Sequence, residues 1–175
     1  MGVNSNPNLI SLLTGGSVAE FEDGSEEPEA KLINAVYREH GYITFTMEDG
    51  AGEPTFPNTK FRNAPADIYF LPFFQAINQA LDMRCGLVGG WGYFQYLQGK
   101  KLHKYQFDVI HDFLEKYKSD PTFAFIHLQE YTHNDQNLAR LYDDDLSTML
   151  GRKIKGGKYI FKKRFSIFQH FIFSP

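Results

Sequence analysis

Hydrophobic residues recur along this chain at two spacings, which predict alternating helices and strands. Apolar residues three or four apart form buried stripes and indicate amphipathic helices. Strands are indicated instead by alternation with β-branched residues, or by a continuous apolar run of about six residues. The expected helices cover residues 5–15, 28–40, 73–81, 102–118 and 137–150, and the expected strands cover residues 42–47 and 123–128.

This order of elements predicts an α/β fold in which a mostly parallel sheet carries helices on both faces. Residues 123–128 read Phe-Ala-Phe-Ile-His-Leu, which is typical of a strand buried inside a parallel sheet. A polar loop, residues 129–136, follows that strand directly. Because open α/β sheets bind ligands at the carboxyl ends of their strands, we expect functional residues at this edge.

Composition excludes several classes of protein. The 175 residues contain 42% hydrophobic and 22% charged residues, as in an ordinary globular domain. Cys85 stands alone, so an internal disulfide is excluded. We expect no signal peptide, because the first residues have neither a basic start nor an apolar core, and no membrane-spanning helix, because no apolar run is long enough. The net charge is −3, but the charges are unevenly distributed, because residues 152–175 contain seven Lys or Arg and no acidic residue. Nucleic-acid binding therefore has little support outside this basic, aromatic tail.

The first expected helix places a hydroxyl group at its N-terminus. Ser5 precedes Pro7, a residue favoured in the first turn of a helix, and Gly15 suits the left-handed position that ends one. Unpaired N–H groups and the positive end of the helix dipole favour an anion there. Ser5 is thus a candidate nucleophile for phosphate or sulfate esters, or simply the cap of an ordinary helix.

A second polar cluster lies in the loop after the buried strand. His133 and Asp135 combine an imidazole with a carboxylate, which suits zinc or a similar divalent ion. The other interpretation is a solvated, hydrogen-bonded histidine. Asp143, Asp144 and Asp145 follow in the next helix, where helical spacing points them in different directions, so we interpret them as surface charge.

Four motifs together resemble an animal family of unknown function within the alkaline phosphatase and sulfatase superfamily. The resemblance covers about residues 4–157. Its motifs are Ser5-x-Pro-Asn with Leu-Leu-Thr-Gly at residues 12–15, Gly-Tyr-x-Thr-x-x-x-Glu-Asp at residues 41–49, Asp-x-Tyr-x-x-Pro at residues 67–72, and Tyr-Thr-His-Asn-Asp at residues 131–135.

The resemblance implies metal-dependent hydrolysis of phosphate or sulfate esters, with Ser5 as nucleophile and Asn8 holding the phosphoryl oxygens. It implies His133 and Asp135 as ligands of a divalent metal, zinc or calcium. It also implies a secreted or extracellular protein that acts on a small anionic ester or glycan. The rival expectation is a non-catalytic extracellular or membrane-associated binding protein that has kept the fold.

The chain also departs from the superfamily pattern. Glu48 and Asp49 stand where sulfatases carry the Lys and His that clamp sulfate, and two carboxylates repel an anion. The expected Asp-His-Gly strand is missing after Gly157. We therefore expect a partial alkaline-phosphatase-like domain over residues 1–157, with a sheet incomplete at both ends, and a divergent tail over residues 158–175. We expect weak or missing metal and no metal-dependent hydrolysis.

Overall fold

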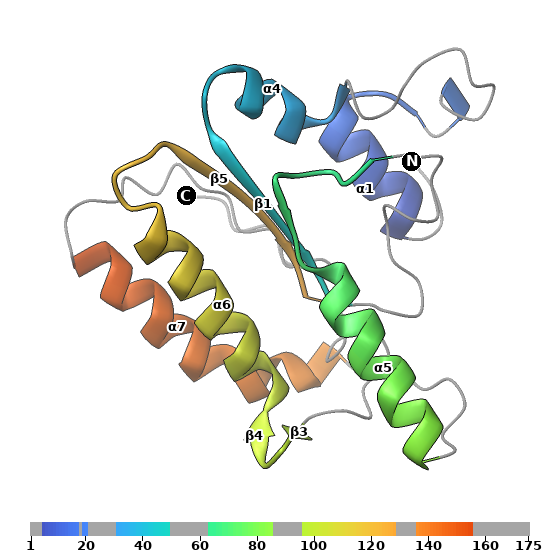
Figure 1. Ribbon diagram of the computed structural model, residues 1–175, viewed down its shortest axis with the longest axis vertical. Coiled ribbons are helices and arrows are strands. Elements are labelled where there is room, and N and C mark those ends of the chain that lie inside the picture. Colours follow the sequence, from blue (N-terminus) through green and yellow to red (C-terminus); the bar gives the residue numbers. More distant parts are fainter. Residues whose placement is uncertain are drawn as a thin grey trace.

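The computed structural model describes residues 5–17, 19–20, 31–49, 63–85, 96–128 and 136–155 (Figure 1). The five expected helices and the two expected strands are all present, whereas three short strands of two residues each were not expected from the hydrophobic pattern. The helices are α1 (Ser5–Thr14), α4 (Ile33–Glu39), α5 (Leu71–Cys85), α6 (Leu102–Lys116) and α7 (Arg140–Lys155), with a short 3-10 helix at Gln136–Ala139. The strands are β1 (Ile43–Glu48), β2 (Ile68–Tyr69), β3 (Tyr96–Leu97), β4 (Lys100–Lys101) and β5 (Thr122–His127).

The main sheet is parallel and has the order β2-β1-β5. Ile43 pairs with Thr122 at one end of the β1–β5 ladder, and Glu48 pairs with His127 at the other. On its second side β1 pairs with β2, where Phe45 is opposite Ile68. The α/β class with a mostly parallel sheet is therefore confirmed. The short strands β3 and β4 form a separate antiparallel hairpin.

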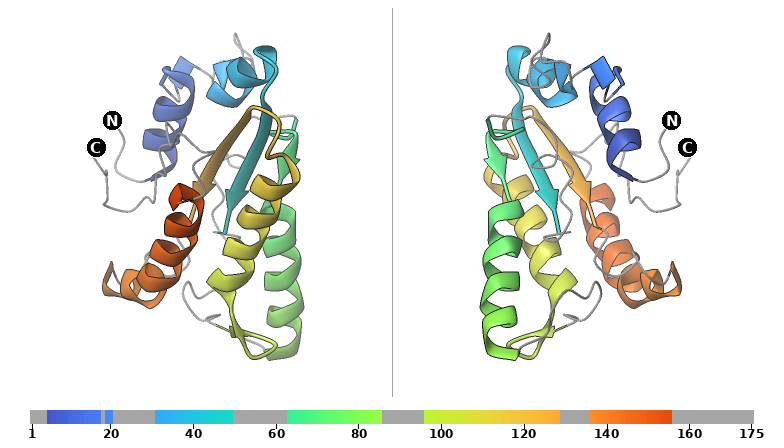
Figure 2. Two further views of the ribbon diagram at one scale, coloured as in Figure 1. Left: turned by 90° about the vertical axis from the view of Figure 1, so that its left-hand side faces the viewer. Right: turned by 90° about the vertical axis from the view of Figure 1, so that its right-hand side faces the viewer.

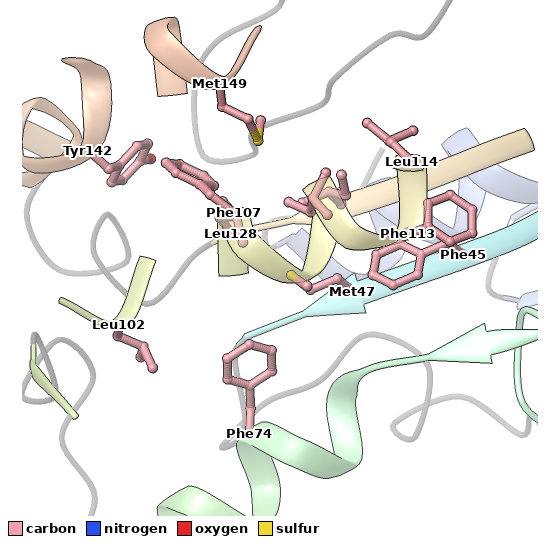
Figure 3. Close-up of a cluster of buried hydrophobic side chains, with 12 residues drawn as sticks. Phe45, Met47, Phe74, Leu102, Phe107, Phe113, Leu114, Leu128, Tyr142 and Met149 are labelled. Carbon is pink, nitrogen blue, oxygen red and sulfur yellow. The ribbon is translucent and has the colours of Figure 1, made fainter. Parts of the chain in front are cut away.

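Side chains of β1 alternate between the two faces of the sheet. Phe45 and Met47 belong to a large apolar cluster with residues of α5, α6 and α7 (Figure 3). Thr46 points the other way, where its hydroxyl oxygen accepts a hydrogen bond of 2.9 Å from the buried side chain of Asn34 in α4. Helices thus cover both faces, because each face of a buried strand needs apolar cover.

The second face of the sheet is covered by α1 and α4 (Figure 2). Leu9 and Leu13 of α1 pack with Leu32 and with Phe125 of β5 in a second, smaller apolar cluster. The helix α1 begins on the side toward which β1 and β5 run, and it proceeds in the opposite direction to them (Figures 1 and 2). Its first turn therefore lies toward the carboxyl end of the sheet.

Two helix ends differ from the expectation. The helix α5 continues to Cys85 instead of stopping near residue 81. The prediction that Gly151 ends the last helix is wrong, because α7 continues through Gly151 to Lys155. The expected division at residue 157 lies outside the described residues and stays a prediction.

The end of α4 has the form that Gly41 predicts. Gly41 adopts a positive φ of 80°, and the amide of Tyr42 donates to the carbonyl of Tyr37 at 3.0 Å. The amide of Gly41 donates to the carbonyl of Arg38 at 2.9 Å. This pair of bonds is a Schellman motif, and only three residues separate the end of α4 from the start of β1.

Replacing glycine by alanine at positions 41 and 151 should have opposite effects. A Cβ atom meets no neighbour within 4 Å at either position, so only the backbone conformation decides. Gly41→Ala should lower the free energy of unfolding by about 1 kcal/mol, because the left-handed conformation is strained for alanine. Gly151→Ala should raise it by about 0.5 to 1 kcal/mol, because position 151 lies inside a helix. Urea denaturation checks both signs, and equal signs would contradict this assignment.

Candidate functional site

Buried polar side chains gather where β1 and β5 end. Glu48 and His127 are the last residues of these strands, and Asp49 follows β1 directly. Their exposed fractions are 0%, 1% and 3%, and Gln106 of α6 is equally buried. Buried charged groups are costly unless they are paired or hydrogen-bonded. Their presence at the carboxyl edge of the sheet marks this edge as the candidate functional site.

On the α1 side of this edge, Glu48 is held between two partners. The hydroxyl of Tyr69 in β2 donates to Oε2 of Glu48 at 3.2 Å, and Nδ1 of His127 lies 3.7 Å from Oε1. Burial and the neighbouring Glu48 carboxylate raise the pKa of Tyr69, so its hydroxyl stays protonated and acts as a donor. The three side chains come from three adjacent strands, and they form what we call the Glu48 network.

On the opposite face, α6 supplies the partner of the second carboxylate. The side-chain amide of Gln106 donates to Oδ2 of Asp49 at 3.0 Å. The backbone amide of Asp49 also donates to the carbonyl of His127 at 3.3 Å, which prolongs the pairing of β1 with β5. Consecutive carboxylates therefore point to opposite faces of the sheet, as strand alternation requires.

Two of the sequence motifs meet at the start of β1. The Thr44 hydroxyl donates to Oδ2 of Asp67 at 2.7 Å, and the Thr44 amide donates to the same oxygen at 2.9 Å. Arg38 lies 3.3 Å from the other carboxylate oxygen. Burial alone would raise the pKa of Asp67, but the hydrogen bonds from Thr44 and the charge of Arg38 outweigh it and lower this pKa. Asp67 therefore fixes the loop before β2 onto β1.

Of the four predicted site residues, Ser5 and Asn8 lie within the described part of the chain, whereas His133 and Asp135 do not. Ser5 is the first residue of α1, so it lies toward the same edge as the Glu48 network, and Asn8 is half-buried in the first turns of that helix. The side chain of Ser5 is outside what the structure describes. His133 and Asp135 also lie outside the described residues, so their role as metal ligands stays a prediction.

Sequence reasoning missed the Glu48 network. It interpreted Glu48 and Asp49 as two carboxylates facing the same anion, whereas the structure separates them on opposite faces and gives each a protein partner. It also took His127 for part of a continuous apolar strand. The available signal was the position of both Glu48 and His127 at the end of a buried strand, where polar residues are unexpected unless they are functional.

The expected divalent metal stays a prediction, because its proposed ligands lie outside the described residues. Within these residues, no group of three or more His, Cys, Asp or Glu side chains is arranged to hold an ion. Glu48 and Asp49 are instead engaged by Tyr69 and Gln106. We therefore assign no step of any reaction to a metal held by this part of the chain.

A second histidine is buried between α6 and α7. Nε2–H of His103 donates to Oδ2 of Asp145 at 2.8 Å, and the ring of His103 lies near Phe107 and Tyr142. The interpretation of Asp143 and Asp144 as surface charge is confirmed. For Asp145 this interpretation is wrong, because Asp145 joins the two helices through His103.

The His103 pair makes stability depend on pH. Burial lowers the pKa of His103, against the opposing effect of Asp145, while Lys101 and Lys104 lower it further. The unfolded chain therefore takes up a proton near the usual pKa of about 6.5, before the folded chain does. The stabilising contribution is complete above this pH and decreases as the pH falls below it.

We expect the free energy of unfolding to fall between pH 7 and pH 5, and to fall less in His103→Asn than in the wild type. Urea denaturation at both pH values measures the difference. His111→Asn is the matched control, because His111 lies on the same helix and its side chain is 45% exposed. An equal loss of stability in His103→Asn and the wild type would contradict this origin of the pH dependence.

Comparison with known proteins identifies a family and nothing more specific. The sequence model of a family described as "Protein of unknown function (DUF229)" matches residues 1–168. No curated protein and no solved structure matches the chain. Among the residues that the structure describes, no helix has the length and apolar character needed to cross a membrane.

Proposed function

The chain belongs to the DUF229 family of proteins of unknown function. From its candidate site we propose that it is a sulfatase- and alkaline-phosphatase-like protein. We propose that it binds a small phosphate or sulfate ester at the first turn of α1. The chemistry of this superfamily is metal-dependent ester hydrolysis. In this chain we propose Ser5 as the nucleophile and Asn8 as a donor to the oxygens of the ester.

One observation carries this proposal. The helix α1 runs against β1 and β5, so its first turn lies toward the carboxyl end of the parallel sheet (Figure 2). Unpaired backbone N–H groups at the start of a helix bind anions. Ligands of open α/β sheets bind at this same end. Ser5 begins the helix, and Pro7, which has no N–H group, occupies the first turn.

The described residues support binding more strongly than metal-dependent turnover. A serine hydroxyl is a weak nucleophile until a base or a metal activates it. The metal ligands expected from the resemblance, His133 and Asp135, lie outside the described residues, and those inside do not form a metal site. We therefore propose that Zn²⁺ and Ca²⁺ add little to the hydrolytic rate of this chain.

Thermal unfolding in inorganic phosphate tests the binding site. Phosphate at 100 times its dissociation constant should stabilise the folded chain by about 2.7 kcal/mol, relative to chloride at the same ionic strength. Asn8→Ala should weaken phosphate binding about tenfold, as expected for the loss of one hydrogen bond to a charged group. Ser11→Ala, on the same helix, is the control and should bind phosphate as the wild type does.

Hydrolysis of 4-nitrophenyl phosphate and 4-nitrophenyl sulfate is measured alongside binding, with Zn²⁺, with Ca²⁺ and with EDTA. We expect the metals to change the rate little. A large metal-dependent rate that is lost in Ser5→Ala would contradict the weak metal site. An absence of any stabilisation by phosphate or sulfate would contradict the proposed binding site itself.

A further inference from the structure

The packing of α7 on α6 places a polar pair among apolar side chains. On α6, the buried residue His103 lies one helical turn before Phe107 and shares its face. On α7, Asp145 lies between Tyr142 and Met149, three residues after one and four before the other. Phe107, Tyr142 and Met149 all belong to the large apolar cluster (Figure 3). A histidine and a carboxylate thus occupy positions in an interface that is otherwise apolar.

The hydrogen bond between His103 and Asp145 joins the two helices directly. Nε2–H of His103 donates to Oδ2 of Asp145 at 2.8 Å, and Nζ of Lys104 lies 3.5 Å from the other carboxylate oxygen. The side chain of His103 is 1% exposed, whereas that of Asp145 is 33% exposed. The imidazole therefore lies inside the interface, and its carboxylate partner lies at the rim, in contact with water.

A positive charge on His103 is unfavourable at this place. Burial disfavours the charged imidazole, and His103 lies in the first turn of α6, where the helix dipole is also positive. Lys101 and Lys104 add two positive charges nearby. Among the described residues, Asp145 is the acid that opposes these effects, and Tyr142 contributes a ring but no charge at neutral or acid pH. The balance, with burial as the largest cause, lowers the pKa of His103.

The helix α7 lies at the outer end of its layer. Figures 1 and 2 show α6 between α5 and α7. Among the described elements, the principal contacts of α7 are with α6 and with the 3-10 helix directly before it. An element with few partners opens at a lower free energy than the core strands of a domain. Separation of α7 from α6 therefore leaves the pairing of β1 with β5 in place.

We propose that the contact between α6 and α7 is an acid-sensitive latch, in which protonation of His103 releases α7 from α6 while the parallel sheet stays intact. In the closed state a neutral imidazole donates to Asp145. In the open state water surrounds the imidazole, which then takes up a proton. This inference is independent of the proposed ester-binding site, and it assigns the effect of acid to one interface instead of to the whole fold.

The charge of His103 in the two states gives the direction and the limit of the effect. The closed state lowers the pKa of His103, whereas the usual value of about 6.5 applies in the open state. Opening therefore becomes easier as the pH falls below about 6.5. From pH 7 to pH 5 its equilibrium constant rises by at most about 25-fold, the limit for uptake of one proton. Asp145 stays ionised over this range, because the hydrogen bond from His103 lowers its pKa.

Hydrogen exchange of the full chain at pH 7 and pH 5, corrected for the intrinsic exchange rates, tests the latch. Amides of α7 should lose protection severalfold at pH 5, and those of β1 and β5 should lose clearly less. In His103→Asn the protection of α7 should be equal at both pH values within about twofold. His111→Asn, on the same helix, is the control and should behave as the wild type does. An equal loss of protection in α7, β1 and β5 would overturn the proposal, because it would show unfolding of the whole chain.

A second variant has the opposite expected effect, and it covers the case in which His103→Asn fails to fold. Asp145→Asn keeps an oxygen that accepts the hydrogen bond from Nε2–H, but it removes the negative charge that favours a protonated imidazole in the closed state. The loss of α7 protection between pH 7 and pH 5 should therefore be larger than in the wild type. A smaller or unchanged loss in Asp145→Asn would overturn the proposal. So would a His103→Asn variant that keeps the full dependence on pH.

Discussion

Phe45→Ala should destabilise the protein more than any other single substitution considered for this chain. Phe45 lies in the middle strand of the sheet with 1% of its surface exposed. Its ring stacks on Phe113 of α6 with 4.8 Å between the ring centres. Truncating a buried phenylalanine costs about 3 to 5 kcal/mol. This is a large part of the total stability of a typical domain, which is about 5 to 15 kcal/mol.

The matched control for Phe45→Ala is Phe73→Ala on α5. Phe73 also contacts other aromatic rings, those of Phe70 and Phe74, but 37% of its surface is exposed. It therefore contributes less buried area, and we expect a loss of about 1 kcal/mol. Urea denaturation of both variants gives the comparison. Equal losses would show that the large apolar cluster is not the main source of stability.

Asp67→Ala has the second-largest expected effect. The substitution removes the oxygen that accepts hydrogen bonds from both the amide and the hydroxyl of Thr44, a residue with no exposed surface. A buried donor left without an acceptor costs about 1 to 3 kcal/mol. We expect a loss in this range at neutral pH. The lowered pKa of Asp67 means that its contribution persists until the carboxylate is protonated in acid.

Two further variants separate the hydrogen bonds of Asp67 from its charge. Asp67→Asn keeps a carbonyl oxygen as acceptor and should lose less stability than Asp67→Ala. Asp108→Ala removes an exposed carboxylate that pairs with Lys100 at the surface, and should change the stability by less than about 1 kcal/mol. If Asp67→Ala is no more damaging than Asp108→Ala, the contact with Thr44 has no structural importance.

Local signals predicted much of the fold correctly. The glycines at positions 15 and 41 end α1 and α4 with the positive φ angles that these positions require. The alternating pattern of residues 42–47 gave β1 to within one residue. These signals succeed because caps and strand patterns depend on neighbours in the sequence. The prediction that Gly151 ends a helix failed because it also used only the local sequence. A glycine inside a helix and a glycine after a helix look alike in the sequence and differ only in backbone conformation.

The position of Glu48 and His127 at strand ends was a usable signal, but their pairing in the Glu48 network could not be predicted, because it depends on contacts between distant segments. Whether Glu48 faces α1 or α6 depends on the register of β1 against β5, and a shift of one residue would reverse it. Nothing near Glu48 in the sequence indicates Tyr69 or His127 as its partners. The candidate position Ser5, by contrast, came from a local helix signal, the serine and proline that begin α1.

The parallel pairing of β1 with β5 also affects how the protein folds while it is being synthesised. Ile43 pairs with Thr122, so about 80 residues separate the two strands, a distance typical of slowly folding topologies. At ordinary rates of translation, β1 leaves the ribosome roughly 4 to 16 s before β5. During this interval β1 lacks its longest pairing, and Phe45 and Met47 lack the helix α6. The nascent chain therefore passes through a stage in which binding by a chaperone would be of greatest benefit.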